Sequence, residues 1–235
     1  MMEVSLLTYT PQPEQLVAAA ARLCYSSKTA TQVRDDFDDS NTTQFISNLI
    51  SMGHYSPFEH ISFTFAIDGV SRALSHQLVR HRIGASFSQK SQRYVKNHQP
   101  EQIVRPRTVA ANQQAKDIFD KAIEDVYAAY ERLLEMGLPA EDARYLLPNA
   151  TATNLVVTMN ARSLLHFFEL RCCRRAQWEI RELAERMLVL VKDVAPTVFS
   201  VAGATCETQG ICHEGKKSCG KVTGDKIISR VEGLV

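Results

Sequence analysis

One stretch, from Ser71 to Tyr94, limits what this chain can form more than any other: it reads SRALSHQLVRHRIGASFSQKSQRY. It opens with helical spacing, because Ala73, Leu74 and Leu78 can face a core. Gly84 and the serines after it weaken a helix and favour a loop. The stretch therefore predicts a helix that leads into a loop, with polar and cationic side chains gathered beside it.

The cations of this stretch suggest an anion site. Arg80, Arg82 and Arg93 each carry a planar fork of N–H donors that suits phosphate, and His81 adds an imidazole. Hydroxyl groups and loop amides add neutral donors. Basic residues are also common at helix ends, where the helix dipole favours positive charge. The triplet RHR alone leaves both interpretations open; the longer pattern favours a phosphate or nucleotide site.

Composition narrows the class of protein. The chain has 235 residues, of which 45% are hydrophobic and 23% charged, as in an ordinary globular protein. Its net charge of +1 gives no overall field for nucleic acid. No apolar run is long enough to span a membrane, and the first residues do not form a signal peptide. We therefore expect a cytoplasmic protein whose six cysteines are thiols or metal ligands and not disulfides.

Periodicity predicts an α+β fold. We expect one domain over residues 1–235, with a small mixed sheet and long packing helices. The acidic segment 34–43 is expected to be a loop. The predicted strands are Met2–Thr10, Ile61–Ile67 and Thr151–Met159; the predicted helices are Pro13–Cys24, Thr42–Met52, Thr108–Met136, a short one from Pro139 and two helical runs within 160–194.

The segment GHYSPFEH, residues 53–60, allows two interpretations. His54, Glu59 and His60 are metal ligands by residue type, but their spacing fits no zinc motif. We favour a helix start, with Ser56 as the N-cap and Pro57 in the first turn. The amides of such a capped turn can still bind a ligand.

The C-terminal tail, residues 206–235, is rich in cysteine and its role is not indicated by the sequence. Cys206, Cys212, His213 and Cys219 match the ligand types of zinc, but no C-x-x-C is present. We therefore expect a reduced, loop-forming tail and predict no metal site.

Four polar residues fall on the helix predicted after position 160. At about 100° per residue, Arg162 and His166 share one face, whereas Arg171 falls near the face of Asn160. One small ligand could hardly meet both Arg162 and Arg171 on an unbroken helix. We interpret the two faces as serving different ligands, or different copies of one site across subunits.

Taken together, four motifs resemble one family, the flavin-dependent thymidylate synthases: RHR followed by Ser91, H-x-S-P-F-E-H, R-x-x-L-P from Arg144, and NARSL from Asn160. The resemblance extends from about Cys24 to Phe199. In the family seven residues separate RHR from the serine; here eight residues, Ile83 to Lys90, stand between Arg82 and Ser91. The loop is thus one residue longer.

The resemblance implies an FAD-dependent methyltransferase that converts dUMP to dTMP. Methylenetetrahydrofolate would supply the carbon and NADPH the reducing equivalents, in a homotetramer with active sites between subunits, without nucleic acid or membrane partners. It implies a catalytic role for Arg171 on the pyrimidine and places His54 near the flavin ring. The FAD-binding residues would be Ser56, Arg80, His81, Arg82, Gln89, Asn160, Arg162 and His166; the substrate-binding residues would be Gln77, Arg80, Gln89, Ser91, Arg93, Arg144 and Arg171.

Two other functions stay open at this point. One is a different flavin- or nucleotide-dependent enzyme on the same scaffold. The other is a phosphate- or nucleic-acid-binding module that uses the RHR loop. Ser91 is a nucleophile by residue type, but no adjacent base is evident to activate it, so we assign it to binding.

Overall fold

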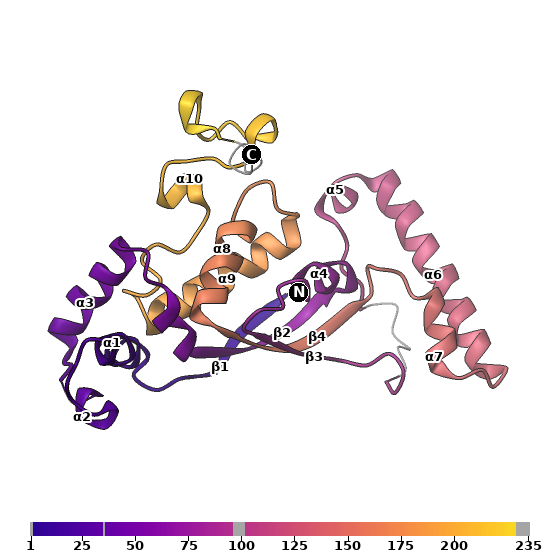
Figure 1. Ribbon diagram of the computed structural model, residues 1–235. Coiled ribbons are helices and arrows are strands. Elements are labelled where there is room, and N and C mark those ends of the chain that lie inside the picture. Colours follow the sequence, from indigo (N-terminus) through magenta and orange to yellow (C-terminus); the bar gives the residue numbers. More distant parts are fainter. Residues whose placement is uncertain (1, 35, 96–101, 229–235) are drawn as a thin grey trace, which may run out of the picture. The chain divides into compact units, whose positions relative to one another are not determined.

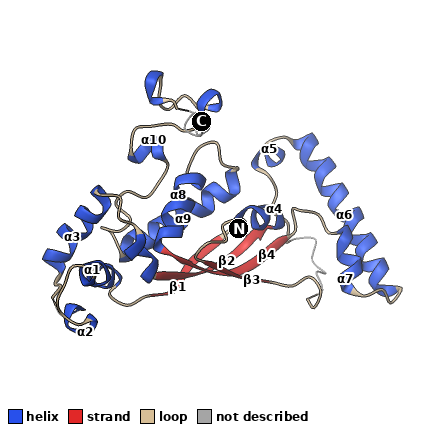
Figure 2. Cartoon of the chain, in the orientation of Figure 1, coloured by secondary structure: helices blue, strands red, loops and turns tan. Residues whose placement is uncertain are grey.

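The computed structural model describes residues 2–34, 36–95 and 102–228. The described residues contain a four-stranded sheet (Figures 1 and 2). The strands lie in the order β1 (Glu3–Tyr9), β2 (Ser62–Ser71), β4 (Ala152–Asn160) and β3 (Ala85–Gln89). The three predicted strands are therefore confirmed, and β3 is a fourth that the sequence did not predict.

The sheet is antiparallel. In the β3–β4 pair, Asn160 N donates to Gly84 O over 2.9 Å while Lys90 N donates to Asn154 O over 3.0 Å, so residue numbers rise in opposite directions. The β2–β4 and β1–β2 pairs show the same sense. Our prediction of a mixed sheet was wrong, because β3 and β4, like the other neighbouring strands, run in opposite directions.

The chain forms two compact units. The first contains Ala66–Arg80 and Phe87–Val156, besides the first three residues. The second contains Val4–Phe65, His81–Ser86 and Val157–Val235. The single domain that we predicted over residues 1–235 stays a prediction.

The first unit carries four helices: α4 (Arg72–Leu78), α5 (Arg107–Ala110), α6 (Gln113–Glu135) and α7 (Ala140–Ala143). Ser71 Oγ accepts Leu74 N and so caps α4. The long helix predicted over Thr108–Met136 is divided, because Asn112 leaves the helical conformation and caps α6 through Ala115 N. Along α6, Ile123, Tyr127 and Tyr130 form the buried stripe.

The second unit carries the other α-helices of the described residues: α1 (Pro13–Leu23), α2 (Ala30–Arg34), α3 (Asp39–Ser51), α8 (Ala161–Arg171), α9 (Trp178–Val194) and α10 (Thr205–Thr208). The predicted helices here are confirmed. Our prediction that the acidic segment 34–43 is a loop was wrong for its second half, since α3 already begins at Asp39.

The turn after α3 corrects the expected cap. Residues Ser56–His60 form a 3-10 helix whose N-cap is Tyr55, without a side-chain cap hydrogen bond. Phe58 N donates to Tyr55 O, so the turn begins one residue earlier than predicted. Pro57 fixes the backbone of the first turn, and the hydroxyl of Ser56 is not needed to start it. The prediction of Ser56 as N-cap was wrong.

Aromatic side chains form the core of the second unit and fix α8. Phe63 of β2 and Phe168 of α8 both lie against Phe199, with ring centroids 5.3 and 6.1 Å apart. All three rings are fully buried, as is Phe167. Burying rings of this size is a leading source of folding free energy. This packing holds the C-terminal half of α8 in place.

The loop expected after Gly84 is instead strand β3. Its sequence, ASFSQ, has weak strand propensity, but the segment pairs with β4 at the edge of the sheet. Pairing with β4 thus decided the conformation of this segment.

None of the helices within residues 2–34, 36–95 and 102–228 is long and apolar enough to cross a membrane.

Candidate functional site

The turn that contains RHR is hydrogen-bonded to the start of α8. Asn160 Oδ1 accepts Ser163 N over 2.9 Å and caps α8. Ser163 Oγ donates to Ile83 O over 2.6 Å, and Asn160 N donates to Gly84 O. The backbone directly after RHR is therefore bonded to the first turn of α8.

Gly84 is required at this contact. Its φ is +62°, a conformation that side-chain-bearing residues rarely adopt. A Cβ at this position would lie 2.5 Å from Ser163 Oγ and closer still to Asn160 Nδ2. Glycine thus permits both the backbone turn and the close approach to α8.

At the other end of α8, Arg171 meets the histidine of RHR. Arg171 Nε donates to His81 Nε2 over 3.0 Å. The His81 ring packs edge-on against Phe167, with centroids 5.0 Å apart, and lies 6.3 Å from the ring of His166. Two predicted site residues that are 90 positions apart in sequence are therefore in direct contact.

The surroundings of His81 keep its imidazole neutral. Burial, followed by the positive charge of Arg171 and the neighbouring His166, lowers the pKa of His81 from 6.5 to about 4. A neutral ring with its proton on Nδ1 can accept a hydrogen bond at Nε2, as Arg171 requires.

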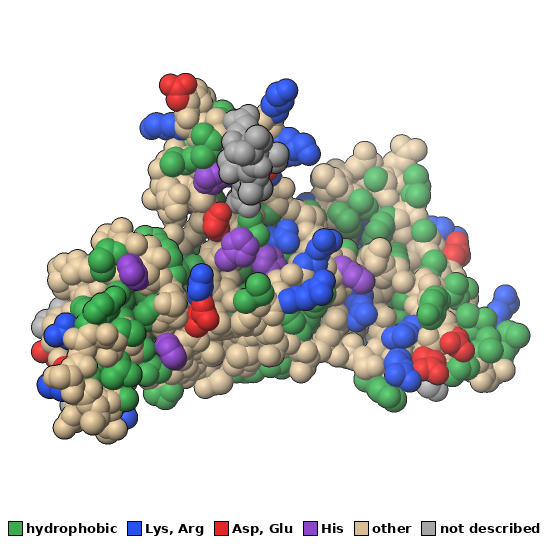
Figure 3. Space-filling model, in the orientation of Figure 1, with side chains coloured by type: hydrophobic (Ala, Val, Ile, Leu, Met, Phe, Trp, Pro, Cys, Tyr) green, Lys and Arg blue, Asp and Glu red, His purple; other side chains and the backbone are tan. Residues whose placement is uncertain are grey.

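The exposed face of α8 carries further predicted residues. Arg162 forms an ion pair with Glu59, and the two side chains are 55% and 48% exposed. His166 Nδ1 lies 3.8 Å from Glu169 Oε2. Figure 3 shows histidine side chains gathered on the surface over α8. Because α8 is an unbroken helix from Ala161 to Arg171, Arg162 and Arg171 stay on different faces of it. His81 nevertheless lies beside both His166 and Arg171, so the two faces that we separated in the sequence meet at this imidazole.

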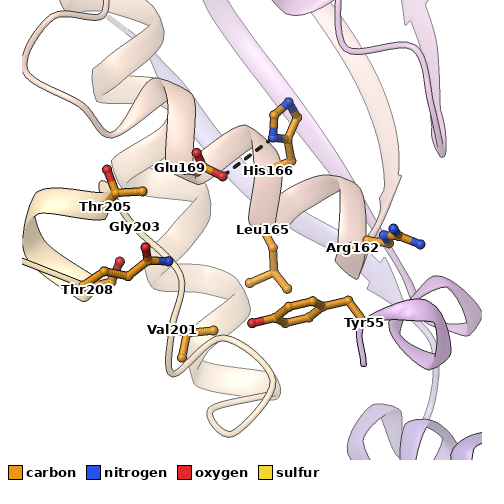
Figure 4. A pocket seen from close by; sticks show the side chains of 10 residues that line it. Tyr55, Arg162, Leu165, His166, Glu169, Val201, Gly203, Thr205 and Thr208 are labelled. Carbon is orange, nitrogen blue, oxygen red and sulfur yellow. Dashed lines mark ion pairs between the residues drawn. The ribbon is translucent and has the colours of Figure 1, made fainter. Parts of the chain in front are cut away.

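A hollow of about 240 Å³ lies beside this face of α8. Figure 4 shows Tyr55, Leu165 and Val201 together on one side of it and Thr205 and Thr208 on another. Its wall thus combines aromatic and apolar surface with hydroxyl groups. Such a lining suits a planar, partly polar ligand.

The first unit holds the other predicted polar residues. Arg93 donates from Nε to Glu141 Oε2 over 2.8 Å, and its Nη2 lies equally close. Arg144 Nε donates to the backbone oxygen of Glu141 over 3.1 Å. Ser91 Oγ accepts Arg93 N. Glu141 therefore holds two predicted substrate-binding arginines together.

Two glutamines of the first unit are tied to neighbouring structure. Gln89 Nε2 donates to Thr153 Oγ1 over 3.2 Å, from β3 to β4. Gln77 Nε2 lies 3.5 Å from Ala73 O within α4. Arg80 follows α4 and is exposed.

The sequence reasoning missed Arg72. This arginine opens α4, where a cation opposes the helix dipole. Burial, and after it the charge of Arg144, lowers its pKa. Two guanidinium groups close enough to repel each other favour an anion between them. An arginine at a helix start was the available signal.

The remaining predicted residues occupy surface positions in the second unit. Ser56 and His54 lie at the 3-10 turn, and Arg82 follows His81; all three are exposed. The six cysteines are free thiols. In the described part of the chain, no three His, Cys, Asp or Glu side chains are grouped as a metal site. Residues 229–235 of the predicted tail lie outside the described residues.

The donor set of the second unit fits a dinucleotide such as FAD. Arg82 and Arg162 are exposed cations that can donate to a diphosphate, and Asn160 and His166 add polar groups on α8. The hollow with Tyr55 offers an aromatic wall for a ring.

The fold is similar to that of a methylase that acts on pyrimidine nucleotides. The chain is similar to the crystal structure of a UMP/dUMP methylase, PolB from Streptomyces cacaoi, bound with 5-Br dUMP. That likeness has a TM-score of 0.72 and 28% identity, over 86% of this chain and 96% of the other.

Sequence comparisons define the family. The family model "Thymidylate synthase complementing protein" matches residues 5–197. The flavin-dependent thymidylate synthase of Geobacter sulfurreducens is 52% identical over 97% of this chain and 98% of that protein. The enzyme of the same name from Clostridium tetani is 46% identical over 97% and 96%. This chain belongs to the flavin-dependent thymidylate synthase family.

Proposed function

We propose that this chain catalyses the reductive methylation of dUMP to dTMP. Methylenetetrahydrofolate supplies the carbon, NADPH supplies the reducing equivalents, and FAD is the bound cofactor. The observation that carries the proposal is the 52% identity to a flavin-dependent thymidylate synthase across nearly the whole of both chains. The similarity to a methylase crystallised with a dUMP analogue supports the substrate class.

We assign FAD binding to residues that the resemblance implies. When bound, FAD carries the hydride chemistry that amino-acid side chains cannot supply. In the second unit, the cations of Arg82 and Arg162 would hold its phosphates, while Asn160 and His166 contact the flavin. The FAD-binding set that we propose is Ser56, Arg80, Arg82, Gln89, Asn160, Arg162 and His166. The resemblance adds His81 to this set, but in the structure its imidazole contacts Arg171.

The dUMP phosphate is assigned to the first unit. Arg144, with Arg72 beside it, would neutralise the phosphate dianion of dUMP. Guanidinium groups suit this role because their charge-assisted hydrogen bonds are stronger than those of neutral donors. Arg93 would add a third cation. Gln77, Gln89 and Ser91 would supply neutral hydrogen bonds to the sugar and base.

Arg171 is assigned the catalytic role. Adding a carbon to the pyrimidine requires electron density on the ring, and negative charge then develops on a ring oxygen. A guanidinium held at that oxygen would stabilise the charge in the transition state.

We propose that the active enzyme is a homotetramer with active sites between subunits. Its cytoplasmic location stays a prediction.

The visible spectrum of the purified protein tests the proposal. After incubation with FAD and desalting, we expect a retained flavin spectrum that dUMP perturbs. Adding methylenetetrahydrofolate and NADPH should then form dTMP and tetrahydrofolate. Protein that retains flavin but makes no dTMP would indicate another flavin-dependent enzyme. Colourless protein with salt-sensitive oligonucleotide binding would instead favour a nucleic-acid-binding module.

A further inference from the structure

We propose that His81 is a positioning residue for Arg171: its Nε2 accepts the Arg171 Nε–H and thereby fixes the plane of the guanidinium that acts on the pyrimidine. This inference rests on the proposed function, which assigns Arg171 to the substrate. It differs from the FAD contact expected for His81 on resemblance, because it makes a neighbouring protein side chain the partner of the imidazole.

The hydrogen bond to His81 is made by Arg171 Nε and not by the two terminal Nη groups of the guanidinium. An arginine side chain has five N–H donors, one on Nε and four on the two Nη atoms. The 3.0 Å bond to His81 uses Nε only. A bond at Nε fixes the guanidinium plane, since rotation about the side chain would break it. In any arginine side chain, the two Nη groups have a spacing that matches a planar oxygen-bearing ligand.

His81 is itself held from three directions. Phe167 packs edge-on against one side of its ring, and His166 lies on another. The backbone after the RHR turn is bonded to the first turn of α8 through Ile83 and Gly84. The imidazole, Phe167 and Arg171 therefore belong to one unit with both ends of α8. An acceptor fixed in this way costs little ordering when a ligand arrives.

The charge state agrees with this role. Arg171 and His166 are the titratable groups that face His81, and both disfavour an imidazolium, as does burial. A neutral imidazole accepts at Nε2, whereas an imidazolium would present a second donor to a guanidinium that can only donate. The site therefore supplies an acceptor throughout the neutral pH range.

Three variants test the proposal in the full-length, FAD-loaded protein. His81→Leu keeps an apolar side chain against Phe167 but removes the acceptor. His81→Gln replaces it with an amide whose oxygen can occupy the place of Nε2. His76→Gln is the matched control, because His76 is exposed on α4 and has no role in the proposal. Flavin absorbance and circular dichroism check loading and folding.

We expect His81→Leu to retain flavin and to lower kcat for dTMP formation about 10- to 100-fold, with a smaller change in KM for dUMP. His81→Gln should recover most of that loss, and His76→Gln should match the parent. The decisive measurement is a double-mutant cycle. In an Arg171→Ala background, His81→Leu should cause little further loss, because the positioned group is already gone.

Other results overturn the inference. A His81→Leu variant with parental kcat, or one whose loss adds fully to that of Arg171→Ala, would show that His81 does not act through Arg171. Loss of flavin from folded His81→Leu and His81→Gln would make His81 a cofactor contact instead. If the parent protein forms no dTMP, the proposed function fails first, and the variants are not needed to see it.

Discussion

Two arginines assigned to the substrate are held in opposite ways. Arg171 is half-buried at the end of α8 and bonded to a neutral imidazole that packs on Phe167. Arg93 is 50% exposed and bonded to Glu141, which is 47% exposed on the short helix α7. A buried hydrogen bond of fixed geometry orients a group before the ligand arrives. An exposed ion pair is screened by water and easily exchanged for a ligand anion.

We infer that Arg171 acts through its exact orientation and Arg93 through its charge. We interpret Arg171 as the group that must be aligned to within a fraction of an ångström, because transition-state stabilisation depends on geometry. Arg93 needs only to supply a cation. On this interpretation, the carboxylate of Glu141 is a partner that a phosphate would displace. Four predictions test this difference, in order of decreasing effect.

Arg171→Ala tests the aligned arginine most directly. We expect kcat to fall about 10²–10³-fold, as when one preorganised donor to a developing charge is lost, while FAD stays bound. Arg175→Ala is the matched control, since Arg175 lies four residues later and is exposed. Steady-state dTMP formation and flavin absorbance are the measurements. A near-normal rate would show that Arg171 has no catalytic role.

Gly84→Ala tests whether the RHR turn must lie close to α8. We expect the free energy of unfolding to fall by about 2–5 kcal/mol, because left-handed strain and steric overlap with Asn160 add together. Gly137→Ala separates the two causes, since Gly137 also has a positive φ, of +84°, but no atom near its absent Cβ. Urea unfolding followed by circular dichroism should give the larger loss at Gly84; equal losses would mean that the contact with α8 is unimportant.

Acid unfolding tests the neutral state of His81. The pKa of His81 is about 4 in the folded chain and near 6.5 when unfolded, so the unfolded chain binds more protons between these values. Stability contributed by the neutral ring is present above pH 6.5 and is lost as the pH falls towards 4. We expect His81→Gln to reduce this slope in unfolding free energy against pH. Parallel slopes for variant and parent would argue against a lowered pKa.

Glu141→Gln should have the smallest effect. It removes the charge of the exposed pair with Arg93, and we expect a change in unfolding free energy below about 1 kcal/mol. The difference should shrink further as salt is raised, because exposed charges are screened. A loss above about 2 kcal/mol in urea unfolding would place Arg93 among the rigid residues, and the contrast with Arg171 would disappear.

Local signals in the sequence predicted most elements. The alternation in β4, the apolar stripe of α6 and the caps of proline and glycine specify strands and helices without distant partners. These signals failed where another segment supplies the stabilising contacts. Strand β3 has a serine-rich sequence that only its pairing with β4 makes extended. Ser56 has the right residue type for a cap, but the 3-10 turn begins at Tyr55.

The sequence by itself determined which residues could carry the chemistry: the RHR triplet, the arginines at 93, 144 and 171, and the helix that begins at Asn160. Tertiary structure alone decided their partners. His81 and Arg171 meet because Gly84 lets the RHR turn approach α8, and Arg72 lies near Arg144 although no sequence motif pointed to Arg72. The physical reason is that residue type fixes charge and hydrogen-bonding capacity, whereas burial, orientation and pKa depend on neighbours that are distant along the chain.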